Sequence, residues 1–162
     1  MTKKAVNFIV KAREGSRCKY NYSDGKLELE SMLPKGAQYP ENYGAVSQTL
    51  DDARKKLDGF LITNESIEPG TSVKVRPVAC IRTEEEGVKN DKVVVVPEID
   101  PDKDNIKDLE DLDRKLLIEL KAFVNELCQA EGKDVEIKDT FGSRDARRLI
   151  KHCKKIYKRR KE

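Results

Sequence analysis

The sequence has no tryptophan and a single histidine, His152. Its four cysteines are far apart and form no CxxC pair: Cys18, Cys80, Cys128 and Cys153. Protein zinc sites combine several Cys and His ligands at short spacings, so the chain offers no zinc site of this kind. Without any sign of a secretory context, we expect four free thiols.

Long apolar runs are also missing. None approaches the roughly 20 residues that a membrane-spanning helix needs. The first 16 residues contain neither the apolar core of a signal peptide nor an Arg- and Ser-rich transit pattern. We therefore expect no membrane span, no export and a cytoplasmic location. The length of 162 residues fits one domain, residues 1–162.

Charge is abundant but unevenly placed. Charged residues make up 39% of the chain and the net charge is +3. Residues 144–162 hold ten Lys or Arg against Asp145 and Glu162, which gives this tail +8 and leaves −5 for the remainder. A basic tail on an acidic body indicates either an anionic partner or a well-solvated helix.

Strand patterns dominate the first two thirds of the chain. Short β-branched or alternating segments are separated by turn signals such as Ser23-Asp24-Gly25. The predicted strands are residues 5–13, 17–22, 26–32, 57–63, 72–82 and 92–96.

Helical periodicity follows. Leucines and other apolar residues recur at three- and four-residue spacing over 108–131, which predicts an amphipathic helix that ends near Gly132. Residues 133–139 alternate as a strand. A second, basic helix is predicted over about 143–161, with Ser143 as its N-cap. Strands followed by two helices predict an α+β fold, in which a β-barrel or sheet carries the helices.

Several blocks are similar to those of family I (soluble) inorganic pyrophosphatases, in the same order and at the same spacing. Residues 15–20 (GSRCKY) resemble the family's GSRNKYE, 39–44 (YPENYG) its YPxxYG, and 106–112 (IKDLEDL) its IKDLxDLP. The blocks at 69–78 and 92–97 match as well, so the resemblance runs from about residue 6 to 155. It implies a five-stranded OB-like β-barrel with two flanking α-helices.

The resemblance also implies hydrolysis of pyrophosphate to phosphate by a cluster of Mg²⁺ ions held by carboxylates. The family's central DGDPxD motif corresponds here to residues 53–58, ARKKLD, in which only Asp58 keeps its carboxylate. Ala53 cannot bind a metal, and Lys55 reverses the charge. At ~4 Å and an effective dielectric of ~20, a lysine repels a divalent cation by roughly 8 kcal/mol.

Substitutions extend over the whole family site. The retained family positions are Lys19, Tyr43, Asp58, Glu86 and Lys92. The substituted ones are Lys11, Asn21, Ser31, Ala53, Lys55, Asn90, Leu127 and Cys128. We therefore expect a divergent homologue with a degenerate site, a pseudoenzyme without a resident cofactor that acts as a binding or structural subunit of an assembly.

Two alternatives concern the same cavity. A weakly active diphosphatase would need a Mg²⁺ site rebuilt from neighbouring carboxylates, namely Asp51, Asp52, Asp58, Glu85, Glu86 and Asp91. Alternatively, four lysines would replace the metals in an anion-binding pocket: Lys11, Lys19, Lys55 and Lys92. In the plainer interpretation, these lysines are neutralised by carboxylates of the same chain.

The basic tail supports a third function, sequence-independent binding of RNA within a ribonucleoprotein assembly. The residues expected to face outward are Arg147, Arg148, Lys151, Lys154, Lys155 and Lys158. Since family members assemble into dimers or hexamers, the resemblance implies a homo-oligomer or a mixed oligomer with relatives.

Overall fold

A closed barrel of five strands forms the centre of the protein, which the computed structural model describes over residues 6–160. The strands are bonded in the order β1, β4, β5, β8 and β6, and β6 pairs back with β1. Only the β5–β8 pair is parallel. The bounds are β1 Val6–Ala12, β4 Asn42–Val46, β5 Asp58–Leu61, β6 Ser72–Glu85 and β8 Lys92–Pro97.

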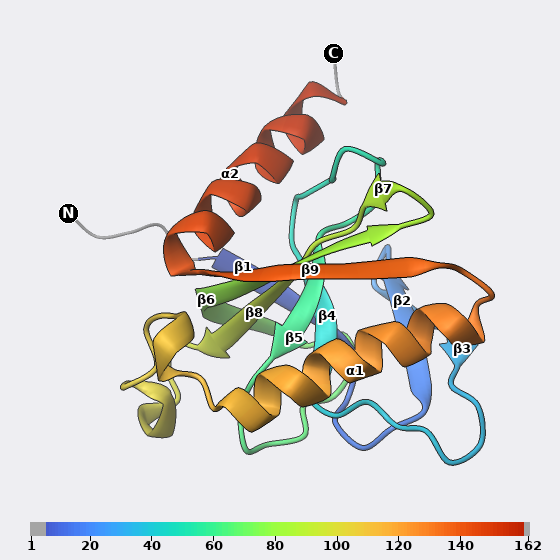
Figure 1. The fold of residues 1–162 in the computed structure, drawn as a ribbon, viewed down its shortest axis with the longest axis horizontal. Helices are drawn as coiled ribbons and strands as arrows, with labels where there is room; N and C mark the ends of the chain where they lie inside the picture. The colour runs from blue at the N-terminus through green and yellow to red at the C-terminus, as the bar shows by residue number, and fades with distance from the viewer. Residues whose placement is uncertain (1–5, 161–162) are drawn as a thin grey trace.

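Further elements extend this barrel. Strands β7 and β9 pair with β6, whereas β2 and β3 form a separate hairpin. Figure 1 shows helices α1 and α2 on opposite sides of β9. The bounds are β2 Cys18–Ser23, β3 Lys26–Met32, β7 Val88–Lys89, β9 Val135–Gly142, α1 Arg114–Ala130 and α2 Ser143–Arg159. Two 3-10 helices, η1 Pro101–Lys103 and η2 Leu109–Asp111, precede α1. The predicted mainly β barrel with two flanking helices is therefore confirmed.

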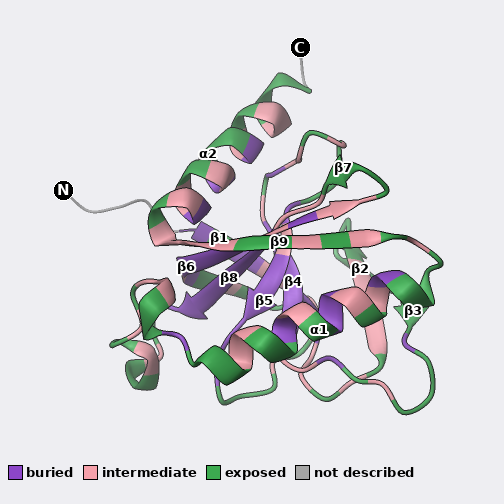
Figure 2. Ribbon diagram, in the orientation of Figure 1, coloured by how far each residue is buried: buried purple, intermediate pink, exposed green. Residues whose placement is uncertain are grey.

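The core fills the barrel and the spaces beneath both helices (Figure 2). All six residues of β8 are buried, as a β-branched strand in the middle of a barrel requires. Phe123 of α1 packs on an aromatic cluster that includes Tyr39 and Phe60. On the other side, Ile150 and Cys153 of α2 are buried against the barrel. Each helix thus buries one apolar face and presents the other to solvent.

The structure departs from the prediction at strand β4, at the two-residue strand β7, which was not predicted either, and at the starts of both helices. Strand β4 was not predicted, although all five of its residues are buried. The helix predicted from residue 108 begins only at Arg114. Asp108 and Asp111 form a capping box around η2, and Asp113 is extended and accepts a hydrogen bond from the Lys115 backbone N–H at 3.0 Å.

The start of α2 also differs. Ser143 is the first helical residue and not the N-cap, which is Gly142 and makes no side-chain cap. Asp108 takes this role from outside the helix, since its Oδ1 accepts from the Ser143 backbone N–H at 2.9 Å. Helix α2 ends at Arg159, and residue 161 of the predicted helix lies outside the described residues. Within residues 6–160, neither helix has the length and apolar character that crossing a bilayer demands.

Candidate functional site

Four neighbouring strands and the β2–β3 hairpin bring five predicted site residues to one place. Lys11 comes from β1, Tyr43 from β4, Asp58 from β5, Lys92 from β8 and Lys19 from β2. The Tyr43 hydroxyl donates to Asp58 Oδ2 at 3.1 Å. Lys19 Nζ lies 5.7 Å from the centroid of the Tyr43 ring, and Lys92 Nζ lies 5.9 Å from it. Tyr43 is therefore the centre of a mainly cationic cluster.

Lys11 and Asp58 form a buried ion pair in this cluster. Lys11 Nζ lies 3.7 Å from Asp58 Oδ1, and only 8% of Lys11 is exposed. Burial lowers the pKa of Lys11 even though Asp58 favours its charged form. Asp58 Oδ1 is itself buried and has no hydrogen-bond donor among the described residues. The lysine is thus the nearest positive charge to the one carboxylate that residues 53–58 retain.

Lys19 forms an ion pair within the β2–β3 hairpin. Its Nζ lies 2.9 Å from Glu30 Oε2 on β3. Burial disfavours the ammonium, but Asp58 and Glu30 outweigh this effect and raise the pKa of Lys19. The substituted residues Asn21 and Ser31 lie on the same hairpin, and Ser31 pairs with Lys19 across it. Both charged family residues expected at these two positions are therefore absent.

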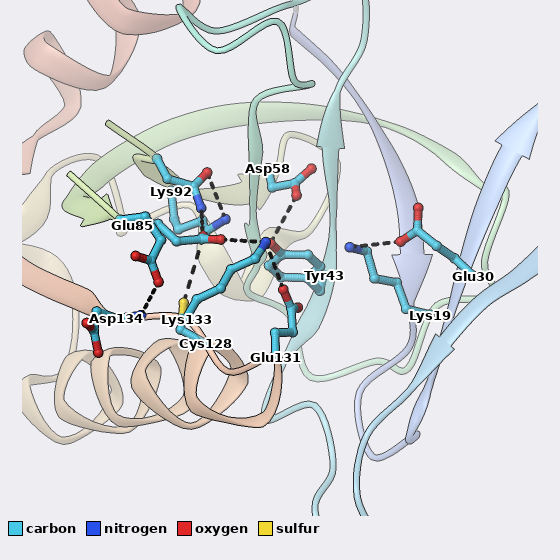
Figure 3. A network of polar contacts seen from close by, with 12 residues as sticks. Lys19, Glu30, Tyr43, Asp58, Glu85, Lys92, Cys128, Glu131, Lys133 and Asp134 are labelled. Atoms are coloured by element: carbon cyan, nitrogen blue, oxygen red, sulfur yellow. Dashed lines mark hydrogen bonds and ion pairs between the residues drawn. The ribbon is translucent and has the colours of Figure 1, made fainter. Parts of the chain in front are cut away.

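A second ion pair involves Glu85 at the end of β6 (Figure 3). Lys133 Nζ lies 2.8 Å from Glu85 Oε1, and the Asn90 side-chain amide donates to Oε2 of the same carboxylate. Lys92 Nζ donates to Asn90 Oδ1 at 3.4 Å. Although burial alone would raise it, the pKa of Glu85 is lowered by Lys133 and Asn90. Cys128 Sγ lies 3.8 Å from Glu85 Oε2, and burial raises the pKa of this thiol.

Residues 53–56 of the altered motif form a loop beside this pair, in which Arg54, Lys55 and Lys56 are exposed. Ala53 and Lys55 line a cavity of about 310 Å³ together with Glu85, Glu86 and Lys133. Lys11 instead lines a separate cavity of about 210 Å³. The four lysines predicted to form one anion pocket are thus divided: Lys11, Lys19 and Lys92 surround Tyr43 and Asp58, while Lys55 faces the cavity at Glu85.

The other candidate carboxylates bond elsewhere. Asp51 Oδ1 accepts from the backbone N–H groups of Ala53 and Lys55, both at 2.9 Å. The remaining three also have their own partners: Asp52 with His152 at 2.9 Å, Glu86 with the Asp134 N–H at 2.8 Å, and Asp91 with the Thr83 N–H at 3.2 Å. Over residues 6–160, no three His, Cys, Asp or Glu side chains gather as a metal site would require. This arrangement differs from the clustered carboxylates that hold Mg²⁺ in the family.

Lys133 was missed by reasoning from the sequence. It follows Gly132, whose φ of +71° turns the chain at the end of α1. This turn directs Lys133 toward both Glu85 and Glu131. Lys133 Nζ lies 3.3 Å from Glu131 Oε2. No motif marks the residue. Leu127, by contrast, has a simple role, since it packs against the core cluster under α1.

Helix α2 bears a basic groove along the side where it meets β1, and of the six residues predicted to face outward Arg147 and Lys154 are half-buried. Five residues of the predicted basic surface line a cavity of about 470 Å³ with Val6 and Ile150: Arg147, Lys151, Lys154, Lys155 and Lys158. Arg148 is exposed outside it. None of these side chains has a carboxylate within 4.0 Å among the described residues. The groove therefore carries uncompensated positive charge.

The family assignment follows from comparison with known proteins. The model of a family described as inorganic pyrophosphatase matches residues 8–158. An inorganic pyrophosphatase of Nanoarchaeum equitans is 33% identical over 157 residues, which cover 95% of this chain and 98% of that protein. One from Haloferax volcanii is 31% identical, with 92% and 86% covered. The crystal structure of the Thermus thermophilus inorganic pyrophosphatase superposes with a TM-score of 0.88 at 28% identity, covering 97% of this chain and 93% of that one. This chain is therefore a divergent member of the inorganic pyrophosphatase family.

Proposed function

We propose that this family member has lost Mg²⁺-dependent hydrolysis of pyrophosphate and acts as a non-catalytic binding subunit. One observation carries the proposal: lysines occupy the places next to the carboxylates that remain. Lys11 pairs with Asp58, and Lys133 pairs with Glu85. An ammonium beside each carboxylate repels a divalent cation, and at Glu85 it also occupies an oxygen that a cation would need.

The altered loop supports the same proposal. Lys55 stands at the position that orients the attacking water in the family, and an ammonium cannot accept a proton from that water. Asp51 is close enough in the sequence to replace a lost ligand, but its carboxylate caps the turn of the loop. Asp52 is equally close, and its carboxylate contacts His152 on α2.

Phosphate release tests this proposal. The protein, freed of host pyrophosphatase, is incubated with pyrophosphate with and without Mg²⁺. We expect no metal-dependent turnover above background. The matched control carries Ala53→Asp and Lys55→Asp, which restore two acids of the family motif. Any increase in Mg²⁺-dependent release in this variant would locate the loss of activity in the loop.

Metal-dependent turnover by the unaltered chain would contradict the proposal. The chain would then be a weakly active diphosphatase, and its carboxylates would have to rearrange around the metal. Substitution of Asp58, Glu85 or Asp91 by the corresponding amide would identify the ligands, since losing a metal ligand or its support commonly costs about 10–100-fold or more.

A second candidate function is binding of a polyanion such as RNA to α2. The groove lined by Arg147, Lys151, Lys154, Lys155 and Lys158 is the observation that favours it. Such binding releases counterions, so it weakens steeply with salt. Filter binding of RNA at about 50 and 200 mM salt tests it. Loss of binding is expected when Arg147, Lys151 and Lys155 are replaced by Gln, changes that remove the charge but keep α2 and its buried face. The circular dichroism spectrum of this variant should match that of the natural chain.

The proposal also includes assembly with copies of the same chain or with relatives, as the family resemblance implies. Light scattering coupled to size-exclusion chromatography gives the mass in solution. A mass of 18.5 kDa at micromolar concentration would contradict a homo-oligomer.

A further inference from the structure

The altered motif and helix α2 form one continuous surface. The Leu50 backbone N–H donates to the Cys153 carbonyl at 3.1 Å, and Asp52 contacts His152 at 2.9 Å. In Figure 1, the loop between β4 and β5 rises beside α2. These two contacts fix the loop against the helix, so that a charge on either element adds to the same face of the molecule.

The substitutions that remove the family's acids also make this loop basic. Arg54, Lys55 and Lys56 are all exposed, and they replace positions where the family motif has glycine, aspartate and proline. Asp51 in the same loop is used to cap the turn, and Asp52 is next to His152. The loop therefore extends the positive charge of α2 toward the barrel.

Tyr157 lies where the two basic elements meet. It lines a cavity of about 210 Å³ with Lys11, Lys56 and Gln48. It also lines an adjoining cavity with Gln48, Lys154 and Lys158. The last two lysines continue into the groove along α2. The three cavities thus share lining residues and follow one path from the barrel to the helix.

This path combines the two features that single-stranded nucleic acids require, a cationic groove and planar side chains for base stacking. The Arg160 guanidinium stacks on the Tyr157 ring at 3.9 Å, and guanidinium planes also stack on bases. A duplex cannot use this ring, because its bases are already stacked and paired.

We propose that a single-stranded nucleic acid binds along this path, with a base stacked at Tyr157 and its phosphates beside Lys56, Lys154 and Lys158. The inference rests on the polyanion binding proposed for α2 and specifies its ligand. It also gives the altered motif a role in binding.

Fluorescence anisotropy of the full chain with a labelled oligouridine of about 12 nucleotides tests the proposal, with an RNA duplex of equal length as comparison. We expect tighter binding of the single strand. Tyr157→Ala should weaken it about fivefold or more, whereas Tyr157→Phe should retain most of it, since stacking of one base contributes ~1–3 kcal/mol. Circular dichroism verifies that each variant is folded.

Charge-reversal variants test the part of the path on α2 and the part on the loop separately. Lys154→Glu with Lys158→Glu should weaken binding and reduce the slope of log K against log salt by about 1.4, because each phosphate that is no longer neutralised accounts for about 0.7. Lys56→Glu should reduce single-strand binding more than duplex binding. The matched control, Lys35→Glu with Lys115→Glu, changes the same number of exposed charges away from α2 and should leave binding unchanged.

Three results would overturn the inference. Equal binding of duplex and single strand with no effect of Tyr157→Ala would leave α2 as a general polyanion site without base stacking. Inorganic polyphosphate that competes as well as oligouridine at equal phosphate concentration would lead to the same conclusion. No binding of any polyanion would remove both this inference and the RNA function of α2.

Discussion

At the scale of single residues, the site is defined by ammonium groups that contact carboxylates. The carboxylate also affects Tyr43, whose hydroxyl donates to Asp58. Burial, together with the negative charge of Asp58, raises the pKa of Tyr43 well above its usual value. Asp58 in turn depends on Lys11 for charge compensation, because one of its oxygens has no hydrogen-bond donor among the described residues.

Lys11→Met should destabilise the protein by about 3 kcal/mol, because it leaves a buried carboxylate without its countercharge. Lys11→Met should lower the free energy of unfolding much less in a chain that already carries Asp58→Asn. Urea unfolding of the two single variants and the double variant measures this coupling. Additive losses would show that the pair contributes no interaction energy.

Glu41 provides a pH-dependent prediction. Burial, with a smaller contribution from Glu14, raises its pKa from 4.5 to about 7. The folded chain therefore binds more protons than the unfolded chain between these values, and the free energy of unfolding falls as pH rises from 4.5 through 7. Glu41→Gln should be more stable than the natural chain at about pH 8, by about 1 kcal/mol once solvent screening of this half-buried group is allowed for.

Urea unfolding at about pH 4, 6 and 8 measures this difference, which should disappear at the lowest of these values. Glu126→Gln, at an exposed position of α1, removes one surface carboxylate and serves as the matched control. A constant difference between the Glu41 variant and the natural chain at all three values would contradict the prediction.

At the scale of elements, Asp108 connects three of them. Its Oδ1 accepts from the Leu109 N–H of η2 at 2.8 Å and from the Ser143 N–H of α2 at 2.9 Å. A Cβ on Gly142 would lie 2.3 Å from this oxygen, so glycine at the end of β9 leaves the space that the carboxylate fills. One side chain thus replaces the local N-cap that α2 lacks.

Asp108→Ala should lower stability by about 1–2 kcal/mol at neutral pH, the usual cost of a lost cap. The hydrogen bonds from Ser143 and Leu109 lower the pKa of Asp108 below 3.8. Its contribution is therefore complete above that value and is lost as the pH falls below it. Thermal unfolding at about pH 7 and pH 3 measures the change. Asp108→Asn, which keeps a hydrogen-bond acceptor without the charge, should lose less stability than Asp108→Ala. An equal loss of stability for Asp108→Ala at both pH values would contradict this account.

At the scale of the whole molecule, barrel closure depends on close approach of strand backbones. Gly44 of β4 faces β1, and a Cβ there would lie 2.0 Å from the Ile9 carbonyl oxygen. Gly59 of β5 is placed likewise, 2.2 Å from the Val93 carbonyl oxygen. Both neighbours are backbone atoms, which cannot move aside as a flexible side chain can.

Gly44→Ala should therefore destabilise the barrel by about 3 kcal/mol or more, at the upper end of overpacking effects. Guanidinium unfolding followed by circular dichroism measures the loss. Ser72→Ala on β6, an exposed position, should change stability by less than about 0.5 kcal/mol. A similar small effect at Gly44 would show that β1 and β4 can separate without cost.

The sequence determined most of the elements and the family. Alternation and β-branched runs predict β1, β2, β3, β6 and β8, because these patterns reflect burial on strand faces. It also revealed the substitutions at Ala53 and Lys55, since the blocks around residues 53–58 keep the family's spacing. Strand β4 was not predicted because the segment NYGAV contains glycine and asparagine, and only neighbours on both sides of the barrel make it a strand.

Only the tertiary structure decided how the charges combine. Lys133 is 48 residues from Glu85 in the chain, and Asp52 is 100 from His152, so no local pattern links either pair. Asp108 lies 35 residues before the helix that it caps. The meeting of such distant side chains depends on barrel closure and on the turn at Gly132. For this reason the sequence could indicate a cationic cavity, whereas the fold determined which lysines are paired with carboxylates and which line an open groove.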